Sequence, residues 1–470
     1  MSSDPGSSRM SRKEAIASAE GYFDSGAFRD DLARRVAIPT ESQNPDRGAI
    51  LADYLEAEIR PALEALGFTC RIVAEGKWPF LMAERIEDAA RPTMLGYGHG
   101  DVVRGLDEGW EEGLSPWRLT ERGDRWYGRG VADNKGQHTI NLGALRAVLE
   151  TRGRLGFNAR YLFEMGEEVM SPALREFATK HKAALAADVL IASDGPRLSA
   201  GRPTVFLGSR GAISFDLRID ARAGGHHSGN WGGLLSDPAI QLAHAIANIA
   251  APTGQIRIRE WLPEKMPDNV RRALADCEIE PVAGDPEIDP GWGEPGLTPA
   301  EKVFGWCSFA VLAFEAGNPK APVNAIPPSA FARCQLRFVT GIDVDRVVPA
   351  LREHLDRHGF PFVKITRASE QLFRASRVDP DHPWVKWIVE SLTRTTGARP
   401  AILPSLGGSL PNDIFAEVLG LPTVWVPHSY PGCSQHAPNE HLPVAIAREG
   451  LALMAGLYWD LGEPGTPASS

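Results

Sequence analysis

The chain has 470 residues, of which 43% are hydrophobic and 23% are charged, and its formal net charge is -10. This is the composition of an ordinary globular protein, and the length predicts two domains because a single hydrophobic core rarely grows so large. A scattered acidic surplus of this size gives no reason to expect a nucleic-acid partner. No apolar run is long enough to span a bilayer, so no membrane association is expected.

The cysteines and the N-terminal sequence indicate a reducing compartment. The five cysteines are odd in number and form no C-x-x-C pair, which argues against a disulfide framework. The first twenty residues, MSSDPGSSRMSRKEAIASAE, contain no apolar core of the kind that a signal peptide needs. We therefore expect a cytoplasmic protein.

The first part of the chain alternates between helical and extended patterns. Residues 13–37 and 48–66 have helical patterns, and Gly67 ends the second. Further helices are predicted after Asn134 and after Pro172. Five short apolar runs between and around them predict strands, namely FTCRIVAE, FLMAERI, TMLGYGH, FNARYLFEM and DVLIASD. This alternation predicts an α/β layer with a mixed, largely parallel sheet that is flanked by helices.

The composition changes near Arg202, which predicts a second domain inserted into the first. Residues 203–221 have the pattern of one long strand or hairpin with one solvent-exposed face, and a helix is predicted over 238–249. Residues 251–299, rich in Pro, Gly and Trp, are predicted to be mostly loop. Two strands, AFARCQLRFV and PFVKITRAS, then flank a helix, and α/β character returns from Pro383. The predicted boundaries are 1–204 and 378–470 for the first domain and 205–377 for the inserted α+β domain.

Acids and histidines stand at the ends of several apolar runs. They are His99 and Asp101 in MLGYGHGDVV, Asp133 in WYGRGVADNKG, Glu167 and Glu168 in YLFEMGEEV, Asp194 in VLIASDG, and His436 in CSQHAPNE. Sites in α/β proteins form at the carboxyl ends of the strands, so these side chains are expected to converge. Converging carboxylates and imidazoles are what a pair of hydrolytic metal ions requires.

Each of these residues also has an ordinary local interpretation. Asp133 or Asn134 could cap the helix that follows, Asp194 could form an Asp-Gly turn, and the two glutamates could form a solvated turn. His428 and His441 flank the same loop as His436 and are weaker rivals for its role.

Taken together, the segments resemble the zinc-dependent peptidase and deacylase family of carnosine dipeptidase, acetylornithine deacetylase, succinyl-diaminopimelate desuccinylase and carboxypeptidase G. The resemblance covers residues 30–461 in order, and YGRGVADNKG, SRG and HSGNWGG look closest to the dipeptidase branch. It implies a zinc-aminopeptidase-like catalytic domain with an inserted domain that serves for dimerisation and as a lid.

The resemblance also implies a role for each residue of the site. His99 and Asp194 would hold one zinc ion, Glu168 and His436 the other, and Asp133 would bridge them. The Asp133–Asn134 peptide would be cis. Mn²⁺ or Co²⁺ could replace Zn²⁺, because such sites accept several divalent ions. Glu167 would be the general base, and Asp101 would orient His99.

The inserted domain is expected to contribute substrate contacts. His227, in GGHHSGNWGG, matches the histidine that reaches the partner subunit's site in a homodimer and steadies the oxyanion. Asn324 and Arg337 match substrate-binding positions, and the planar guanidinium of Arg337 suits a carboxylate. Gly408 and Ser409 match the loop that receives the terminal group of the substrate.

These residues predict a dizinc hydrolase that cleaves the amide bond of a dipeptide or an N-acyl amino acid through a metal-bridging hydroxide. One alternative is the same metal centre acting on a non-peptide amide, carbamoyl or ester substrate. A second is an inactive relative that serves as a binding or scaffold subunit, although the presence of Glu167 and of all five ligands disfavours it. A serine hydrolase is disfavoured because the chain has no G-x-S-x-G motif.

Overall fold

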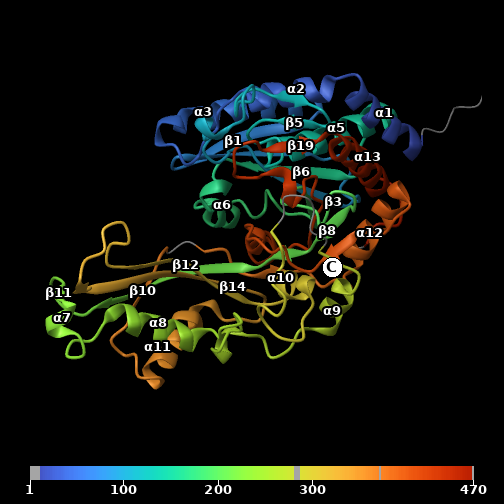
Figure 1. Cartoon of the computed structure of the whole chain (residues 1–470). Helices are drawn as coiled ribbons and strands as arrows, with labels where there is room; N and C mark the ends of the chain where they lie inside the picture. The colour runs from blue at the N-terminus through green and yellow to red at the C-terminus, as the bar shows by residue number, and fades with distance from the viewer. Residues whose placement is uncertain (1–10, 280–285, 370–371, 468–470) are drawn as a thin grey trace, which may run out of the picture.

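A computed structural model describes residues 11–279, 286–369 and 372–467, and it contains one large and one smaller sheet in separate domains (Figure 1). The large sheet has eight strands in the order β1-β2-β6-β3-β7-β18-β8-β17. Their bounds are β1 Thr69–Glu75, β2 Trp78–Arg85, β3 Thr93–His99, β6 Asn158–Glu164, β7 Val189–Ala192, β8 Thr204–Phe206, β17 Ala401–Leu403 and β18 Thr423–Trp425.

The centre of the large sheet is parallel and its margins are mixed. Parallel pairs join β6 to β3, β3 to β7, and β7 to β18, whereas β1–β2, β2–β6 and β18–β8 are antiparallel. All four residues of β7 are buried, as expected for a strand covered on both faces. The predicted α/β class with a mixed, largely parallel sheet is confirmed.

Helices cover both faces of the large sheet. One core cluster includes residues of α1 (Arg12–Asp24), α2 (Ala27–Val36), α5 (Lys135–Arg152), α12 (Pro383–Thr396) and α13 (Val444–Leu461). The other face packs against α6 (Leu174–Lys180), α9 (Asp268–Leu274) and α10 (Pro299–Phe304). The continuous helix predicted over residues 13–37 is wrong in one respect. It is divided into α1 and α2, because Gly26 adopts a left-handed φ of 84°.

The predicted helix at residues 48–66 is one continuous helical segment. It consists of α3 (Gly48–Tyr54), a π-helical turn and α4 (Arg60–Ala65), and Gly67 follows with φ of 76°.

The smaller sheet belongs to the inserted region. It has the order β12-β14-β10-β15, and every neighbouring pair is antiparallel. The strands are β10 (Gly211–Asp220), β12 (Ser308–Ala316), β14 (Ser329–Phe338) and β15 (Lys364–Arg367). Alternate residues of β10 and β14 are buried against α8 (Pro238–Ile249) and α11 (Val344–Arg357), and the residues between them, on the other sheet face, are half-buried or exposed.

The single strand or hairpin predicted over residues 203–221 is wrong. The segment contributes β8 to the large sheet, β9 (Gly208–Ser209) to a pair with β16 (Ser376–Arg377), and β10 to the smaller sheet. The glycine at 208 permits this crossing, because a Cβ atom there would lie 1.9 Å from the carbonyl oxygen of Ser376. The chain therefore passes from one domain to the other within a few residues.

Residues 251–299, predicted to be mostly loop, touch both domains. Trp261 is buried in the core of the smaller domain and donates from Nε1 to the carbonyl of Val347 at 3.0 Å. Met266, Val270 and Leu274 instead join the core beneath the large sheet. Part of this predicted loop, residues 280–285, lies outside the described residues. The predicted domain boundaries stay predictions.

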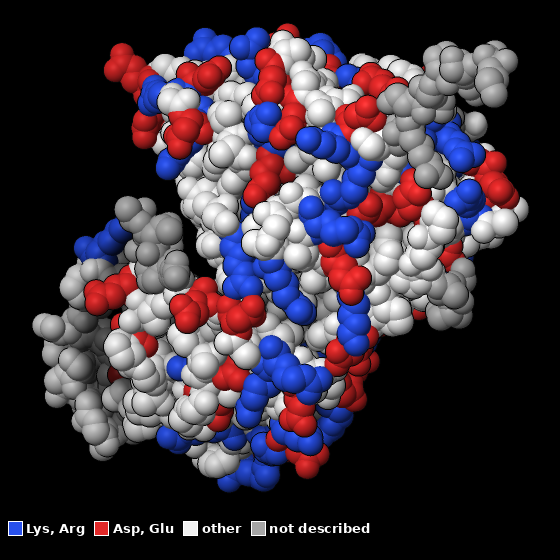
Figure 2. All heavy atoms as spheres, turned by 90° about the vertical axis from the view of Figure 1, so that its right-hand side faces the viewer, with Lys and Arg blue, Asp and Glu red and all other residues white. Residues whose placement is uncertain are grey.

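The surface carries charges of both signs. On the face shown in Figure 2, acidic and basic side chains are intermixed over both domains. Within the described part of the chain, no helix is long and apolar enough to cross a membrane.

Candidate active site

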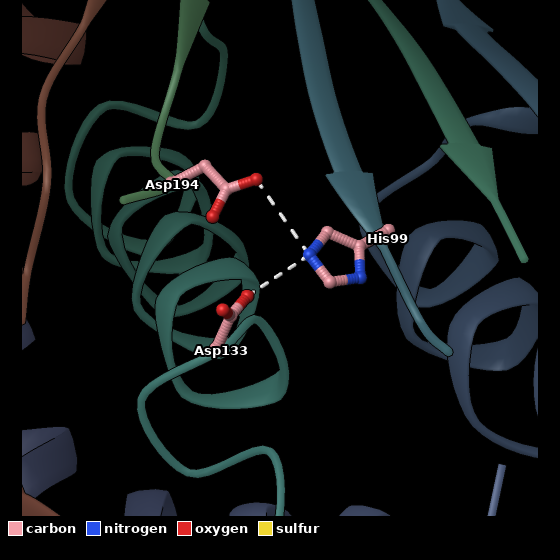
Figure 3. A group of neighbouring side chains, drawn as sticks. All are labelled: His99, Asp133 and Asp194. Carbon is pink, nitrogen blue, oxygen red and sulfur yellow. Dashed lines mark hydrogen bonds and ion pairs between the residues drawn. The ribbon is translucent and has the colours of Figure 1, made fainter. Parts of the chain in front are cut away.

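Three side chains from different elements meet at the carboxyl edge of the large sheet (Figure 3). His99 ends β3, Asp133 lies just before α5, and Asp194 follows β7. The Nε2 atom of His99 lies 3.1 Å from Oδ1 of Asp133 and 3.6 Å from Oδ2 of Asp194. The donor atoms of the three residues lie within 4.8 Å of one another, close enough to share one metal ion.

A second group of three shares Asp133 with the first. The Nε2 atom of His436 lies 3.1 Å from Oδ2 of Asp133 and 3.1 Å from Oε2 of Glu168. Asp133 thus turns one oxygen toward each histidine. The structure brings all five predicted metal ligands together in the two groups that the resemblance implies, with Asp133 common to both.

Asp101 contacts both His99 and the turn that carries Glu167 and Glu168. Its carboxylate accepts the backbone N–H groups of Glu167 at 3.2 Å and Glu168 at 3.1 Å. Its backbone carbonyl and its carboxylate lie 3.0 and 3.4 Å from Nδ1 of His99. Asp101 therefore contacts both the histidine and the turn that carries the two glutamates, as a carboxylate that orients ligands does.

Two of the local alternatives are decided by geometry. Neither Asp133 nor Asn134 caps α5: Asn134 makes no capping hydrogen bond and donates from Nδ2 to the carbonyl of Ser193, while the carboxylate of Asp133 faces the histidines. The Asp133–Asn134 peptide is cis, as the resemblance implies. Asp194 both forms the Asp-Gly turn and faces the site, because Oδ1 accepts the N–H of Gly195 at 2.6 Å while Oδ2 faces His99.

Burial and mutual repulsion shape the protonation of these carboxyl groups. Burial raises the pKa of Glu168 to about 7 and that of Asp194 to about 6, and in both cases the charge of Asp133 adds to the rise. Burial also raises the pKa of Glu167 well above its ordinary value. Burial acts in the same direction on Asp133, but hydrogen bonds from His436 and His99 outweigh it and lower the pKa of that carboxyl.

The cluster fits divalent cations. Oδ2 of Asp194 is buried and has no hydrogen-bond partner, although a buried carboxylate oxygen is costly to leave unpaired. Each group offers two carboxylates and one imidazole, which is a ligand set that Zn²⁺ and related ions accept. A cation between these oxygens would offset both the burial and the repulsion.

A second cluster lies where the two domains meet. Nη1 of Arg337, on β14, lies 3.3 Å from Oγ of Ser409, and that hydroxyl donates to the carbonyl of Arg210 at 2.8 Å. Arg210 in turn donates from Nε and Nη2 to the carbonyl of Gly407 at 2.9 and 2.7 Å. Arg210 is buried, and its guanidinium donates to carbonyl groups and to the hydroxyl of Ser308. The loop with Gly408 and Ser409 thus lies beside two positive charges.

Described residues of the 251–299 segment, together with α10, line a cavity of about 370 Å³ beside this cluster. Its wall is mostly apolar and includes Arg210, Ile256, Trp292, Val303, Trp306 and Phe309. Val303 packs against the loop that carries Gly408 and Ser409, since a Cβ atom on the neighbouring Gly407 would lie 2.8 Å from Cγ1 of Val303. The cavity lies at the seam between the two domains, because Trp306 belongs to one core and Ile256 to the other.

Two predicted site residues are not brought to the metal centre of their own chain. His227 lies in β11 (His226–His227) and Asn324 precedes β13 (Ala325–Ile326), which pairs with β11. Figure 1 shows β11 at the end of the smaller domain that is remote from the large sheet. The imidazole of His227 is exposed and accepts the N–H of Gly229 at 3.1 Å.

The rivals of His436 are engaged elsewhere. His428 is buried against the position of Gly450, and the ring of His441 packs on Tyr127 with a centroid separation of 5.2 Å. Neither belongs to a metal-binding group among the described residues.

Sequence reasoning missed Arg210 and Glu440. Glu440 had one available signal, since it is an acid in the same HAPNE segment as His436.

Comparison with known proteins identifies the class. The model of the peptidase family M20/M25/M40 matches residues 95–460, most of the chain, so the chain belongs to this family. The predicted resemblance is confirmed, and so is the prediction of a metal-dependent hydrolase.

Named relatives lie in the dipeptidase branch of the family. A human Beta-Ala-His dipeptidase is 24% identical over 82% of this chain and 78% of its own length. A Cys-Gly metallodipeptidase of Schizosaccharomyces pombe is 24% identical over 82% and 83%. A mouse Beta-Ala-His dipeptidase reaches 30% identity, but only over about half of each chain. The crystal structure of an M20 family metallo-carboxypeptidase from Sulfolobus solfataricus has the same fold, with a TM-score of 0.78, 24% identity and coverage of 93% and 99%.

The shared Asp133 predicts a specific pattern of metal binding. We expect the wild-type chain to bind two zinc ions, His436→Ala to keep the ion at the other group, and Asp133→Ala to lose tight binding at both. Elemental analysis after dialysis measures the stoichiometry, with His428→Ala as a control histidine outside both groups. Equal loss in the His436 and Asp133 variants would contradict the shared ligand.

Proposed function

We propose that the protein is a two-metal dipeptidase that hydrolyses the amide bond of a small peptide with a free carboxylate. The observation that carries the proposal is Asp133, whose two oxygens each face one of two complete ligand groups. Divalent ions held there would supply Lewis acidity and lower the pKa of a water molecule. The dipeptidase relatives support this substrate class, and the two arginines beside Ser409 support the carboxylate.

Glu167 is the proposed general base. Its backbone N–H donates to Asp101, and its pKa is affected by charges of both metal groups, among them those of His99, Asp194 and Glu168. Glu167 would take the proton of the attacking water and return it to the amine nitrogen that leaves. A carboxyl group whose pKa is raised by burial is suited to both steps at neutral pH.

The substrate carboxylate is proposed to bind at Arg337 and Ser409, with Gly408 allowing close approach of the backbone. The adjacent cavity would then receive the side chain on the carboxylate-bearing residue. Its apolar wall and its position at a domain seam are typical of small-molecule pockets, and its volume suits a large side chain. The favoured dipeptides therefore have a bulky apolar residue at the C-terminal position.

A homodimer would complete the site. β12 is an edge strand of the smaller sheet, and it exposes Val311, Leu312 and Phe314. Leu234 and Val323, also exposed, lie on the segments that follow β11 and precede β13. A grouped apolar edge of this kind is typical of a subunit interface. A second copy paired there would allow His227 to reach the partner subunit's centre and stabilise the oxyanion.

The same centre could act on an N-acyl amino acid, a carbamoyl group or an ester. These alternatives share the metal groups and differ in what binds beyond the scissile bond. Hydrolysis of a panel of dipeptides, N-acyl and N-carbamoyl amino acids with zinc, manganese and cobalt distinguishes them.

Replacing the base tests the mechanism. We expect Glu167→Gln to lower kcat about 10²- to 10⁴-fold because the amide cannot accept a proton, while the zinc content stays at the wild-type level. Peptide hydrolysis is measured together with elemental analysis. Wild-type turnover in this variant would remove Glu167 from the role of base.

Opening the cavity tests the substrate side chain. Trp292→Ala removes part of its wall, and we expect the preference for Gly-Phe over Gly-Gly, measured as kcat/KM, to fall about 10-fold, the loss of ~1.4 kcal/mol of apolar contact. Phe362→Ala, another exposed aromatic, is the control and should leave the preference unchanged. An unaltered preference in Trp292→Ala would exclude this pocket.

Mixed dimers test the role of His227. We expect His227→Ala and Glu167→Gln each to be nearly inactive, whereas reassembled mixtures recover about a quarter of wild-type activity, because half the dimers carry one complete site of two. Size-exclusion chromatography verifies the assembly. A mixture that stays inactive although mixed dimers have formed would place His227 outside the partner's site.

A further inference from the structure

Glu440 is a buried carboxylate that binds the loop carrying Asp133. Its Oε2 atom accepts hydrogen bonds from Nη1 of Arg129 at 2.8 Å and from the backbone N–H of Gly130 at 3.0 Å. Its Oε1 atom accepts the backbone N–H groups of Ala132 at 3.0 Å and Asp133 at 3.1 Å. One side chain therefore accepts three backbone N–H groups of this loop and the guanidinium of a buried arginine.

This arrangement is a built site rather than a surface ion pair. Glu440 and Arg129 are each only 1% exposed, so both charges have been removed from water. A buried carboxylate is tolerated only when its oxygens are fully engaged by charged and backbone donors. Removal of any part of it would leave buried donors of the loop unpaired.

Glu440 also ties the Asp133 loop to the segment that carries His436. It lies four residues after His436, and its own backbone carbonyl accepts the N–H of Gly128 at 3.1 Å. The next residues form β19 (His441–Pro443), which pairs with β5 (Arg125–Tyr127) in the register His441 with Tyr127. The loops that carry Asp133 and His436, two of the three residues of the second metal group, are thus fastened to each other beside that group.

We propose that Glu440 is a positioning residue that sets the distance between Asp133 and His436 and so controls metal affinity. The proposal rests on the two-metal centre proposed above. Asp133 serves both groups, so a displaced loop would weaken both sites at once. Residues that orient metal ligands from behind typically change affinity 10- to 100-fold when they are altered. The hydrogen bonds that Glu440 accepts come from Arg129 and from backbone N–H groups, so it acts on Asp133 through the backbone of its loop.

Glu87 offers a matched control in the same domain. Its carboxylate accepts the backbone N–H groups of Leu155 at 2.7 Å and Gly156 at 2.8 Å, together with Nε of Arg85 at 3.1 Å. It is therefore also a carboxylate that holds a loop through backbone donors and an arginine. None of the residues that it contacts supplies a metal ligand.

The test compares Glu440→Gln with Glu87→Gln in the full chain. Each loses acceptors for backbone donors, so both are expected to show a lower melting temperature in the metal-free state. Calorimetric titration of the chelator-treated proteins with zinc alone should show 10- to 100-fold weaker binding for Glu440→Gln and wild-type binding for Glu87→Gln. With a dipeptide substrate, Glu440→Gln should keep the wild-type KM and regain turnover as zinc is raised.

Wild-type zinc affinity in Glu440→Gln, or an equal loss in Glu87→Gln, would overturn the proposal. If Glu440→Gln does not fold, Glu440→Asp is measured in its place, because it keeps the charge but has a shorter side chain. Its zinc affinity should be below that of the wild type. Weaker zinc binding in a protein that cleaves no peptide would sustain the role of Glu440 and refute the proposed dipeptidase activity, so the two failures are distinguishable.

Discussion

The structure depends on the crowding of buried and half-buried carboxylates at one edge of the large sheet. Asp133, Glu167, Glu168 and Asp194 lie so close that burial and mutual repulsion raise the pKa of three of them. Such a cluster is unfavourable in a folded protein unless positive charge or hydrogen-bond donors compensate for it. Two histidines supply part of that compensation, and the remainder matches what divalent cations provide.

The scaffold around the cluster consists of further carboxylates that act through backbone groups. Asp101 holds the turn of Glu167 and Glu168, and Glu440 holds the loop of Asp133. Both are buried and have their oxygens engaged by N–H groups. The ligands therefore extend from elements whose backbone is already fixed, which reduces the reorganisation that metal binding requires.

The proposed substrate contacts of the smaller domain fall into two parts. Arg337 lies at the domain junction, next to Ser409, and can act within its own chain. His227 and Asn324 lie at the remote end of the same sheet, beside exposed apolar residues. One domain can thus serve both as a lid for its own site and as a donor of side chains to a second copy, and domain motion would couple the two.

The sequence by itself predicted which side chains gather at the centre. Acids and histidines that end apolar strands are expected to meet, since parallel strands bring their carboxyl ends to one edge whatever lies between them. The spacing could not show that residues 203–221 enter three sheets, because the close approach of Gly208 to Ser376 depends on a strand far along the chain. Nor could it distinguish Asp133 as a ligand from a helix cap, since local geometry permits both. Only the tertiary structure placed His436 against one of its oxygens and brought Glu440 behind its loop, because both contacts join segments about 300 residues apart.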